Sequence, residues 1–241
     1  MNYDIDNMTV AEVVTKNIKT ADVFKKNGID FCCGGNVSVK EICEKKSVDY
    51  EKLKAQIEAI ETKVECNLNY DSWDLDFLAD YIVNTHHKYV AEANDLIAQY
   101  SNKVAKVHGN HNPEVVEIND LFMEVAGELN MHMHKEEMIL FPFIRQLANA
   151  KKSGQNIKPP HFGTIQNPIN MMEMEHVDAG DIMKKIAELS NNFTPPDYAC
   201  NTYRALYAKL EEYQNDLFEH IHLENNILFP KAIKLEQELI G

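Results

Sequence analysis

Apolar side chains recur at spacings of three and four residues over four long stretches of the chain. The second stretch shows the pattern from Ile118 to Phe143. This spacing places the apolar residues on one face of a helix, the face that packs into a bundle core. The four predicted helices cover about 73–101, 114–150, 165–191 and 197–238. Glycines and prolines separate them, and no segment alternates at period two for long enough to predict a strand. The predicted fold class is therefore all-α, with a four-helix bundle.

An eleven-residue pattern, H-x-H-x-E-x-x-I-L-F-P, occurs twice, beginning at His132 and again at His220. The two copies lie 88 residues apart (220 − 132), and His87 and His176 repeat at almost the same interval. The pattern indicates a duplicated helix pair. Each copy brings one histidine on its first helix and a histidine–glutamate couple on its second.

These histidines and glutamates fall within the apolar faces of the predicted helices. A buried charge costs several kcal/mol or more unless something pairs with it. One such histidine would be explained by a network of buried hydrogen bonds, but a whole set in register favours a metal site. The set contains His132, Glu136, His176, His220 and Glu224, together with His86 or His87 on the first helix. The apolar pattern of that helix admits either histidine. His134 and His222, two residues beyond the motif histidines, point about 200° away and are not expected to join the site.

Imidazole nitrogen binds iron, copper, zinc and nickel, whereas two carboxylates able to bridge favour a pair of hard cations such as iron or manganese. Four imidazoles and two bridging carboxylates do not fill two octahedral shells. Exogenous ligands such as oxo, hydroxo, dioxygen or nitric oxide are therefore expected to complete them.

Residues 1–66 predict a small domain of short helices, and residues 73–241 predict the bundle domain, with a polar joint at 67–72. Helix starts are marked by capping side chains, two of them in capping boxes that end at Glu12 and Glu41. The expected caps are Thr9, Thr20, Ser38 and Asp49.

The irregular segment of the small domain contains Cys32-Cys33-Gly34-Gly35. The helix that starts after Ser38 presents exposed amides and its dipole, which can lower a thiol pKa. The alternative is a pair of small buried residues in a tight turn. The chain has five cysteines in all, an odd number, and we expect no structural disulfide.

The formal net charge of −14 argues against nucleic acids and anionic membranes as partners. The N-terminus lacks the basic start and apolar run of a signal peptide, and no apolar stretch approaches the length of a membrane span. We expect a cytoplasmic protein.

The CCGG segment followed by a bundle with HxxxExxILFP written twice resembles the repair-of-iron-centres family of di-iron proteins, the ScdA/YtfE type. The resemblance covers essentially the whole chain. It implies a hemerythrin-like bundle that holds two iron ions, bridged by carboxylates and an oxo group. The iron ligands that it implies are His87, His132, Glu136, His176, His220 and Glu224, with both glutamates as bridges. It also favours His87 over His86 and a functional thiol pair, a thiol relay, at Cys32 and Cys33.

The function that the resemblance implies is repair of iron–sulfur clusters damaged by nitric oxide or oxidants in partner proteins. Two mechanisms remain open, donation of iron and binding and reduction of nitric oxide, so an enzymatic nitric oxide reductase activity is one option. The alternative function is a hemerythrin-like sensor or carrier that binds dioxygen or nitric oxide without turnover. A dimer is an option that the sequence leaves open.

Oxygen-carrying hemerythrins place a further histidine one turn after the third-helix ligand, where this chain has Gly180. The site is therefore expected to be more open than that of a carrier. Glu128, one turn before His132, and Glu175, beside His176, are candidates to orient an imidazole or pass a proton. Surface solvation is the alternative for each glutamate.

Overall fold

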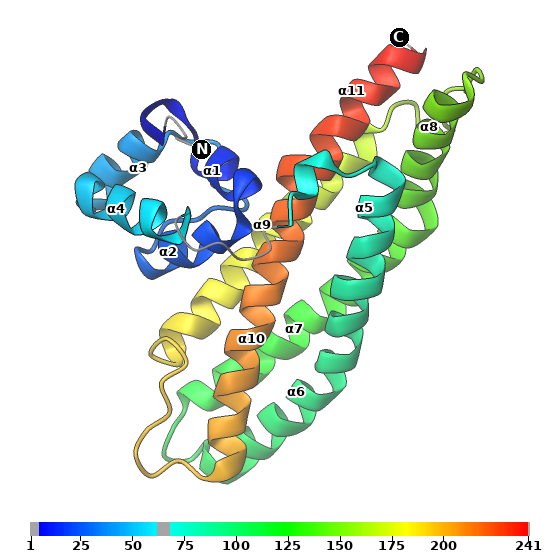
Figure 1. The fold of residues 1–241 in the computed structure, drawn as a ribbon. Coiled ribbons are helices and arrows are strands. Elements are labelled where there is room, and N and C mark those ends of the chain that lie inside the picture. Colours follow the sequence, from blue (N-terminus) through cyan, green and yellow to red (C-terminus); the bar gives the residue numbers. More distant parts are fainter. Residues whose placement is uncertain (1–4, 62–67, 241) are drawn as a thin grey trace.

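The structure, a computed structural model, describes residues 5–61 and 68–240, and this part of the chain is helical without a strand. The prediction of an all-α fold is confirmed. Four long helices run up and down as a bundle, and a group of short helices lies against its side (Figure 1). Among the described helices, none contains an apolar stretch long enough to cross a membrane.

Three of the four bundle helices are interrupted by a π-helical turn. The first helix consists of α5 (Leu75–Ile82), the π turn η4 (Val83–His87) and α6 (Lys88–His108). The second consists of α7 (Glu114–Lys135), the π turn η5 (Glu136–Leu140) and α8 (Phe141–Ser153), and the third is the uninterrupted α9 (Gln166–Leu189). The fourth consists of α10 (Asn201–Leu223), the π turn η6 (Glu224–Leu228) and α11 (Phe229–Ile240). The first helix runs beyond its predicted end at residue 101, and the π turns were not predicted. A π turn inserts one residue into the helical register and is common at functional sites.

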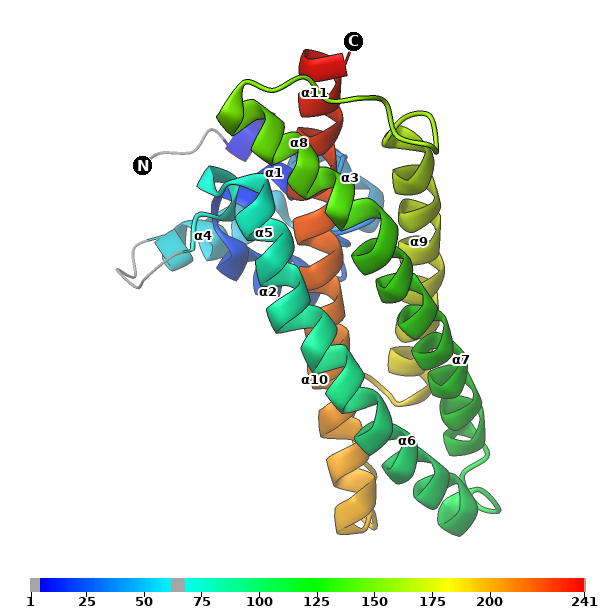
Figure 2. The same cartoon turned by 90° about the vertical axis from the view of Figure 1, so that its right-hand side faces the viewer.

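The apolar core of the bundle divides into two clusters along its length. One cluster, around Phe122 and Leu210, fills the half of the bundle that ends in the α6–α7 and α9–α10 loops, which lie at the lower end of Figure 2. The other, around Phe141 and Phe229, fills the half with α5, α8 and α11. The motif histidines and glutamates lie in sequence between these two clusters. The bundle therefore encloses a polar layer between two apolar ones.

The short helices near the N-terminus, here called the N-terminal module, bury apolar side chains that include Val14, Phe24 and Leu53. They are η1 (Ile5–Asn7), α1 (Val10–Lys16), η2 (Ile18–Thr20), α2 (Ala21–Lys26), α3 (Val39–Lys46) and α4 (Tyr50–Glu61). Thr9 and Glu12 form a complete capping box, and Ser38 accepts the backbone N–H of Glu41. Asp49 accepts the backbone N–H of Lys52 (3.2 Å) as the cap of α4.

One predicted cap is wrong. The Thr20 hydroxyl makes no capping bond to α2 and instead donates to the carbonyl of Asn17 (2.7 Å). Because η2 immediately precedes α2, the chain is already turning at Thr20 and its hydroxyl bonds backwards.

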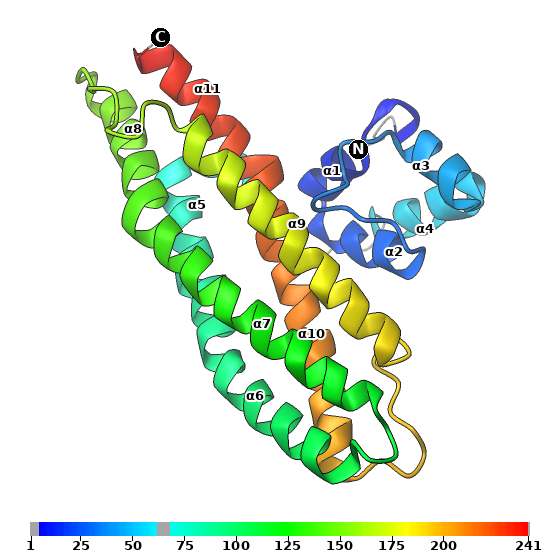
Figure 3. The same ribbon diagram turned by 180° about the vertical axis from the view of Figure 1, so that it is seen from behind.

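The N-terminal module packs against the flank of the bundle formed by α9, α10 and η6 (Figure 3). The ring of Phe31 meets the edges of Phe218 (6.3 Å between centroids) and His222 (5.9 Å). The buried residues of the module and of the adjoining bundle half form one continuous cluster. The predicted joint lies partly outside the described residues, and the division into domains 1–66 and 73–241 stays a prediction.

Candidate metal centre

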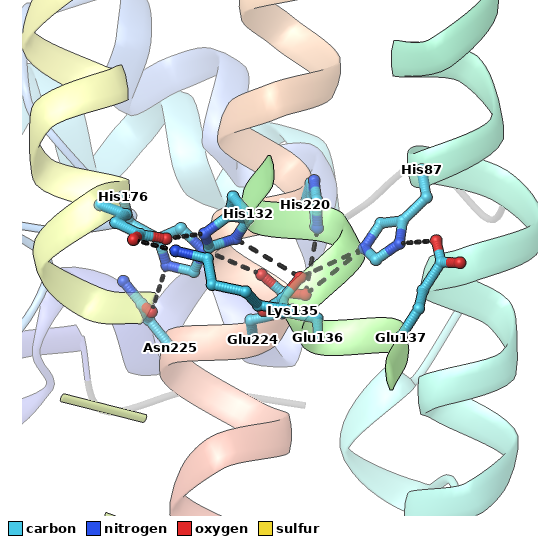
Figure 4. A network of polar contacts seen from close by, with 10 residues as sticks. His87, His132, Lys135, Glu136, Glu137, His176, His220, Glu224 and Asn225 are labelled. Carbon is cyan, nitrogen blue, oxygen red and sulfur yellow. Dashed lines mark hydrogen bonds and ion pairs between the residues drawn. The ribbon is translucent and has the colours of Figure 1, made fainter. Parts of the chain in front are cut away.

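Six side chains converge in the polar layer of the bundle (Figure 4). They form two groups, His87, Glu136, His220 and Glu224 on one side and His132, Glu136, His176 and Glu224 on the other. Within each group, one ligand atom of every residue lies within 4.8 Å of the others. Both glutamates belong to both groups. The layer could therefore hold two neighbouring cations that share two carboxylates.

All four imidazoles turn their Nε2 atoms toward the carboxylates. Nε2 of His87 lies 3.3 Å, and Nε2 of His132 3.4 Å, from Oε2 of Glu136. Nε2 of His176 and of His220 each lie 3.1 Å from an oxygen of Glu224. The Nε2 atoms of His132 and His176 approach to 3.0 Å. This is the donor arrangement that a nitrogen- and oxygen-binding cation requires.

The buried carboxylates of this layer fit a cation rather than a network of hydrogen bonds. Glu136 and Glu224 are fully buried, and the imidazole nitrogens beside Oε2 of Glu136 do not meet it with the angles of a hydrogen bond, so that neither oxygen of Glu136 accepts one within the described residues. The same holds for Oε2 of Glu224, although Nε2 of His176 lies 3.1 Å away, and Nε2 of His87 also makes no hydrogen bond. Leaving a buried polar group unsatisfied costs about 1–3 kcal/mol, and more for a charged one. Four such atoms lie at one place, and a cation bound there could satisfy all of them.

The pKa values of these groups follow from burial opposed by the neighbouring charges. Burial and the charge of Glu224 disfavour ionisation of Glu136, yet His132 and His87 hold the pKa of Glu136 below its ordinary value. Burial acts on Glu224 in the same sense, and His220 and His176 hold its pKa well below the ordinary range. The two carboxylates thus stay anionic and attract positive charge.

The pKa values of the histidines differ according to whether the neighbouring carboxylates or burial has the larger effect. Burial opposes protonation of His132, but Glu136 and Glu175 raise its pKa to about 10. His87 is likewise buried, and Glu136 and Glu224 raise its pKa. At His220 burial prevails over Glu224 and lowers the pKa. In the absence of a metal, a proton on His132 supplies part of the charge that the carboxylates require.

The first helix contributes His87 to the centre, and not His86. The π turn of η4 directs both histidines inward, but His86 belongs to neither group of four. Its Nδ1 contacts Asp216 (3.0 Å), and its ring stacks on His220 at 5.5 Å with an interplanar angle of 12°. His86 is therefore a buried neighbour of the centre.

The outward Nδ1 atoms of three imidazoles are held by hydrogen bonds from neighbouring helices. His87 donates to Glu137 (2.8 Å) and His132 to Glu175 (2.8 Å). His176 donates to the amide oxygen of Asn225 (2.8 Å). Such partners fix the orientation of a ligating imidazole. Glu137 and Asn225 were missed in the sequence because they occupy the variable position that follows each motif glutamate.

Glu128 and Glu175, the two acidic neighbours singled out from the sequence, lie in different surroundings. Glu175 is half-buried and also pairs with Lys135. Glu128 is exposed, but partial desolvation and the nearby carboxylates of Glu124 and Asp178 raise its pKa. Both glutamates line a surface cavity of about 270 Å³ that reaches His132. Only Glu175 bonds to an imidazole.

A second cavity of about 430 Å³ reaches the centre from the opposite side, where it is lined by His87, Glu137 and the exposed His134. His134 and His222 belong to neither group of four, as their helical positions predicted. His222 is nevertheless fully buried. Its ring lies between the module and the bundle, with Nδ1 3.4 Å from the carbonyl of Phe31 and Nε2 3.4 Å from the hydroxyl of Thr15.

The CCGG segment forms a tight loop around the carboxylate of Asp30. Oδ1 of Asp30 accepts the backbone N–H groups of Cys32 (3.0 Å), Cys33 (3.1 Å) and Gly34 (3.2 Å). It also accepts the thiol of Cys32 (3.3 Å). A Cβ at Gly35 would lie 2.5 Å from a backbone oxygen, so only glycine fits there. Asp30 was not identified from the sequence, although Asp before a turn is a common cap of local amides.

The two thiols lie 3.9 Å apart and face different surroundings. Cys32 is buried, whereas Cys33 is partly exposed. The hydrogen bond to Cys33, burial and the charge of Asp30 raise the pKa of the Cys32 thiol well above its ordinary value. The expectation that the Ser38 helix lowers this pKa is wrong for Cys32, because the contact with Cys33, burial and the charge of Asp30 all raise it.

The CCGG loop is fastened to the bundle beside the metal centre. Lys184 of α9 pairs with Oδ2 of Asp30 (2.9 Å), and the side-chain amide of Asn226 donates to the carbonyl of Cys32 (3.2 Å). Asn226 follows Asn225, the partner of His176. The remaining described cysteines, Cys43 and Cys200, are free, and Cys66 lies outside the described residues.

The chain was compared with known proteins. The family model described as "Hemerythrin HHE cation binding domain" matches residues 78–232, and the model ScdA_N, a domain of unknown function, matches residues 6–61. The chain is 34% identical over 222 residues to the iron-sulfur cluster repair protein ScdA of Staphylococcus haemolyticus, covering 92% of this chain and 96% of the relative. It is 33% identical over 233 residues to the iron-sulfur cluster repair protein YtfE of Yersinia pseudotuberculosis, covering 97% and 100%. With both domains matched over nearly the whole length, the chain belongs to the ScdA/YtfE family of hemerythrin-like proteins.

Proposed function

We propose that this protein holds two iron ions and uses them, together with the Cys32–Cys33 thiol pair, to restore damaged iron–sulfur clusters in partner proteins. The observation that carries the proposal is the position of the thiol loop against the bundle. Asn226 holds the carbonyl of Cys32, and its neighbour Asn225 holds His176 of the metal centre. Relatives named as iron-sulfur cluster repair proteins that match nearly the whole chain support it.

The residues of the polar layer suit iron. His87 and His220 would hold one ion, His132 and His176 the other, and Glu136 and Glu224 would bridge them. Imidazole together with bridging carboxylates is a donor set that iron accepts. Bound iron supplies one-electron chemistry and a coordination position for a small ligand such as nitric oxide or dioxygen.

Two routes to repair remain within this proposal. In the first, iron leaves the bundle for a damaged cluster. The centre is enclosed by four helices, so a partner's cluster would not reach it directly, and the thiol pair of the loop docked beside it would carry the iron between the two. In the second route, nitric oxide is removed. Reduction of two nitric oxide molecules to nitrous oxide and water consumes two electrons and two protons, and two ferrous ions can supply the electrons.

The test of the proposal replaces both thiols in the full-length protein. The Cys32→Ser, Cys33→Ser variant should keep its iron but fail to reactivate a [4Fe–4S] enzyme that nitric oxide has inactivated. Cys43→Ser, which changes a buried thiol elsewhere in the module, is the matched control and should repair normally. Unchanged repair by the double variant would contradict the thiol relay. A wild-type protein that binds no iron would contradict the proposal as a whole.

A reversible carrier or sensor of dioxygen or nitric oxide is the second candidate, because the enclosed histidine–glutamate layer alone would serve it. Against it stands the position one turn after His176. Gly180 is buried there, and a Cβ built on it would meet nothing within 4 Å. Open space thus lies beside the position where a carrier has a further imidazole, and the missing imidazole favours a more reactive site.

Addition of nitric oxide without oxygen separates the candidates. Release of nitrous oxide or of iron supports repair, whereas a stable adduct that dissociates unchanged supports the carrier. Gly180→Leu should slow the reaction by filling the free space. Gly127→Leu is the matched control, because Gly127 is also helical with nothing within 4 Å but lies exposed on α7.

A further inference from the structure

The two halves of the metal centre are related by the internal repeat, but the partners of their imidazoles differ in charge. Glu137 and Asn225 occupy equivalent places. Each directly follows a bridging glutamate in a π turn, and each accepts the Nδ1–H of the histidine from the preceding helix, at 2.8 Å in both cases. Figure 4 shows both contacts at opposite ends of the layer. One partner is a carboxylate and the other a neutral amide.

The remaining partners do not cancel this difference. Glu175 holds His132 in the same half as Asn225, but Lys135 pairs with Glu175 and offsets its charge. Glu137 has no such cation: among the ion pairs of residues 5–61 and 68–240, it contacts His87 and neither a lysine nor an arginine. The half that contains His87 and His220 therefore lies in the more negative surroundings.

A carboxylate that accepts a hydrogen bond from a ligating imidazole makes that imidazole a stronger donor. A stronger donor and a negative charge nearby both stabilise the more highly charged state of a bound metal ion. A neutral amide orients the ring equally well without this electrostatic contribution.

We propose that Glu137 and Asn225 are positioning residues that make the two metal positions unequal, so that the ion held by His87 and His220 is oxidised first. This inference rests on the proposed pair of iron ions. It assigns a role to two residues outside the ligand set. It also gives the pair a mixed-valent state with a defined location for the ferric ion.

The experiment exchanges the two side chains in the full-length, iron-loaded protein. Glu137→Gln removes the charge and Asn225→Asp adds it, and each change preserves the shape of the side chain. Redox titration without oxygen, followed by the paramagnetic resonance of the mixed-valent state, gives the separation between the first and second oxidation. Glu128→Gln, which changes an exposed glutamate without an imidazole partner, is the control.

Each single variant should narrow the difference between the first and the second oxidation potential. Glu137→Gln should raise the first oxidation potential, and Asn225→Asp should lower the second. We expect about a tenfold loss in the stability constant of the mixed-valent state, the lower end of effects seen for partners of metal ligands. For one electron this is a shift of about 59 mV. The double variant should recover the separation, because the charge has moved to the other half.

A purely structural role gives a different result, since the double variant would then be more impaired than either single one. That outcome would overturn the inference, and so would an unchanged separation between the two oxidation potentials in Glu137→Gln with both ions retained.

Zinc affinity, measured by chelator competition, supplies a second measurement that needs no iron chemistry. Glu137→Gln should weaken one of two zinc ions about tenfold, and Asn225→Asp should tighten one; the same direction in both variants would also overturn it. The repair assay tests the proposed function separately, because zinc affinities and oxidation potentials can be measured whether or not the protein repairs clusters.

Discussion

Metal should stabilise this protein more strongly as the pH rises. The ligands come from four helices, so a bound ion links the whole bundle and adds its binding free energy to folding. At a free metal concentration 100-fold above the dissociation constant the gain is about 2.7 kcal/mol. For a chain of this size, 1 kcal/mol changes the melting temperature by about 2–4 °C. Chelation should therefore lower the melting temperature by roughly 5–11 °C at neutral pH.

The pH dependence follows from His132. Without metal its pKa is raised to about 10, well above the value of an unfolded histidine. The stability contributed by that proton is fully present below about pH 6.5 and is lost as the pH rises toward 10. Metal must displace the same proton, so its affinity should rise about tenfold for each pH unit in this window, which is about 1.4 kcal/mol. The melting-temperature gain should then grow by about 3–5 °C per pH unit.

The assay is thermal unfolding followed by circular dichroism without oxygen, with buffered ferrous iron or with chelator, between pH 6.5 and 8. His134→Ala changes an exposed histidine on the same helix and should reproduce the wild-type slope. His132→Ala should bind less iron and lose most of the slope. A metal-induced gain that stays flat or falls with rising pH would refute the reasoning, because no proton would then be exchanged for metal.

Two further predictions use pairs of neighbouring residues. His220→Ala should reduce iron to about one ion per chain or fewer, because it removes a donor atom, whereas His222→Ala should keep the metal and lose about 1–3 kcal/mol of stability at the contact with the module; metal analysis and urea unfolding check both. Lys184→Ala should raise the rate of maleimide reaction at Cys32 about 1.5- to 5-fold, because a partly exposed ion pair contributes about 0.2–1 kcal/mol to holding the loop closed. Lys185→Ala, at an exposed position, should leave that rate unchanged, and equal rates in both variants would contradict the role of the ion pair.

The sequence predicted the bundle because helical periodicity is a local property. The long helices lie close to where the apolar spacing placed them, although the first extends to His108. What periodicity did not predict is the π turns at η4, η5 and η6. A π turn changes the register by one residue, and a count of apolar positions tolerates such a slip. The choice between His86 and His87 depended on that register, which explains why the pattern alone left it open.

The six side chains that converge in the polar layer could be assembled from the sequence because they repeat, but their hydrogen-bond partners could not. Glu137 and Asn225 lie at a position where the two copies of the motif differ, so the repeat gave no signal. His222 was expected only to point away from the centre. Whether a residue on that side meets solvent or another element depends on how the module packs, which is a tertiary property. The contacts of Asp30 with Lys184 are unpredictable from spacing for the same reason, since 154 positions separate the two residues.

The differences between the two copies gather where the N-terminal module docks. In the first copy Glu137 is followed by Met138, which is 65% exposed. In the second copy Asn225 holds the ligand His176, and the next residue, Asn226, holds the carbonyl of Cys32. Consecutive residues of one π turn thus contact a metal ligand and the thiol loop. A carboxylate at 225 would add a negative charge next to Asn226, which holds a loop that already contains the carboxylate of Asp30. The neutral pair Asn225–Asn226 adds no charge there, and it leaves His176 without a carboxylate partner. The inequality that we propose for the two metal positions therefore coincides with the docking of the thiol loop beside only one of them.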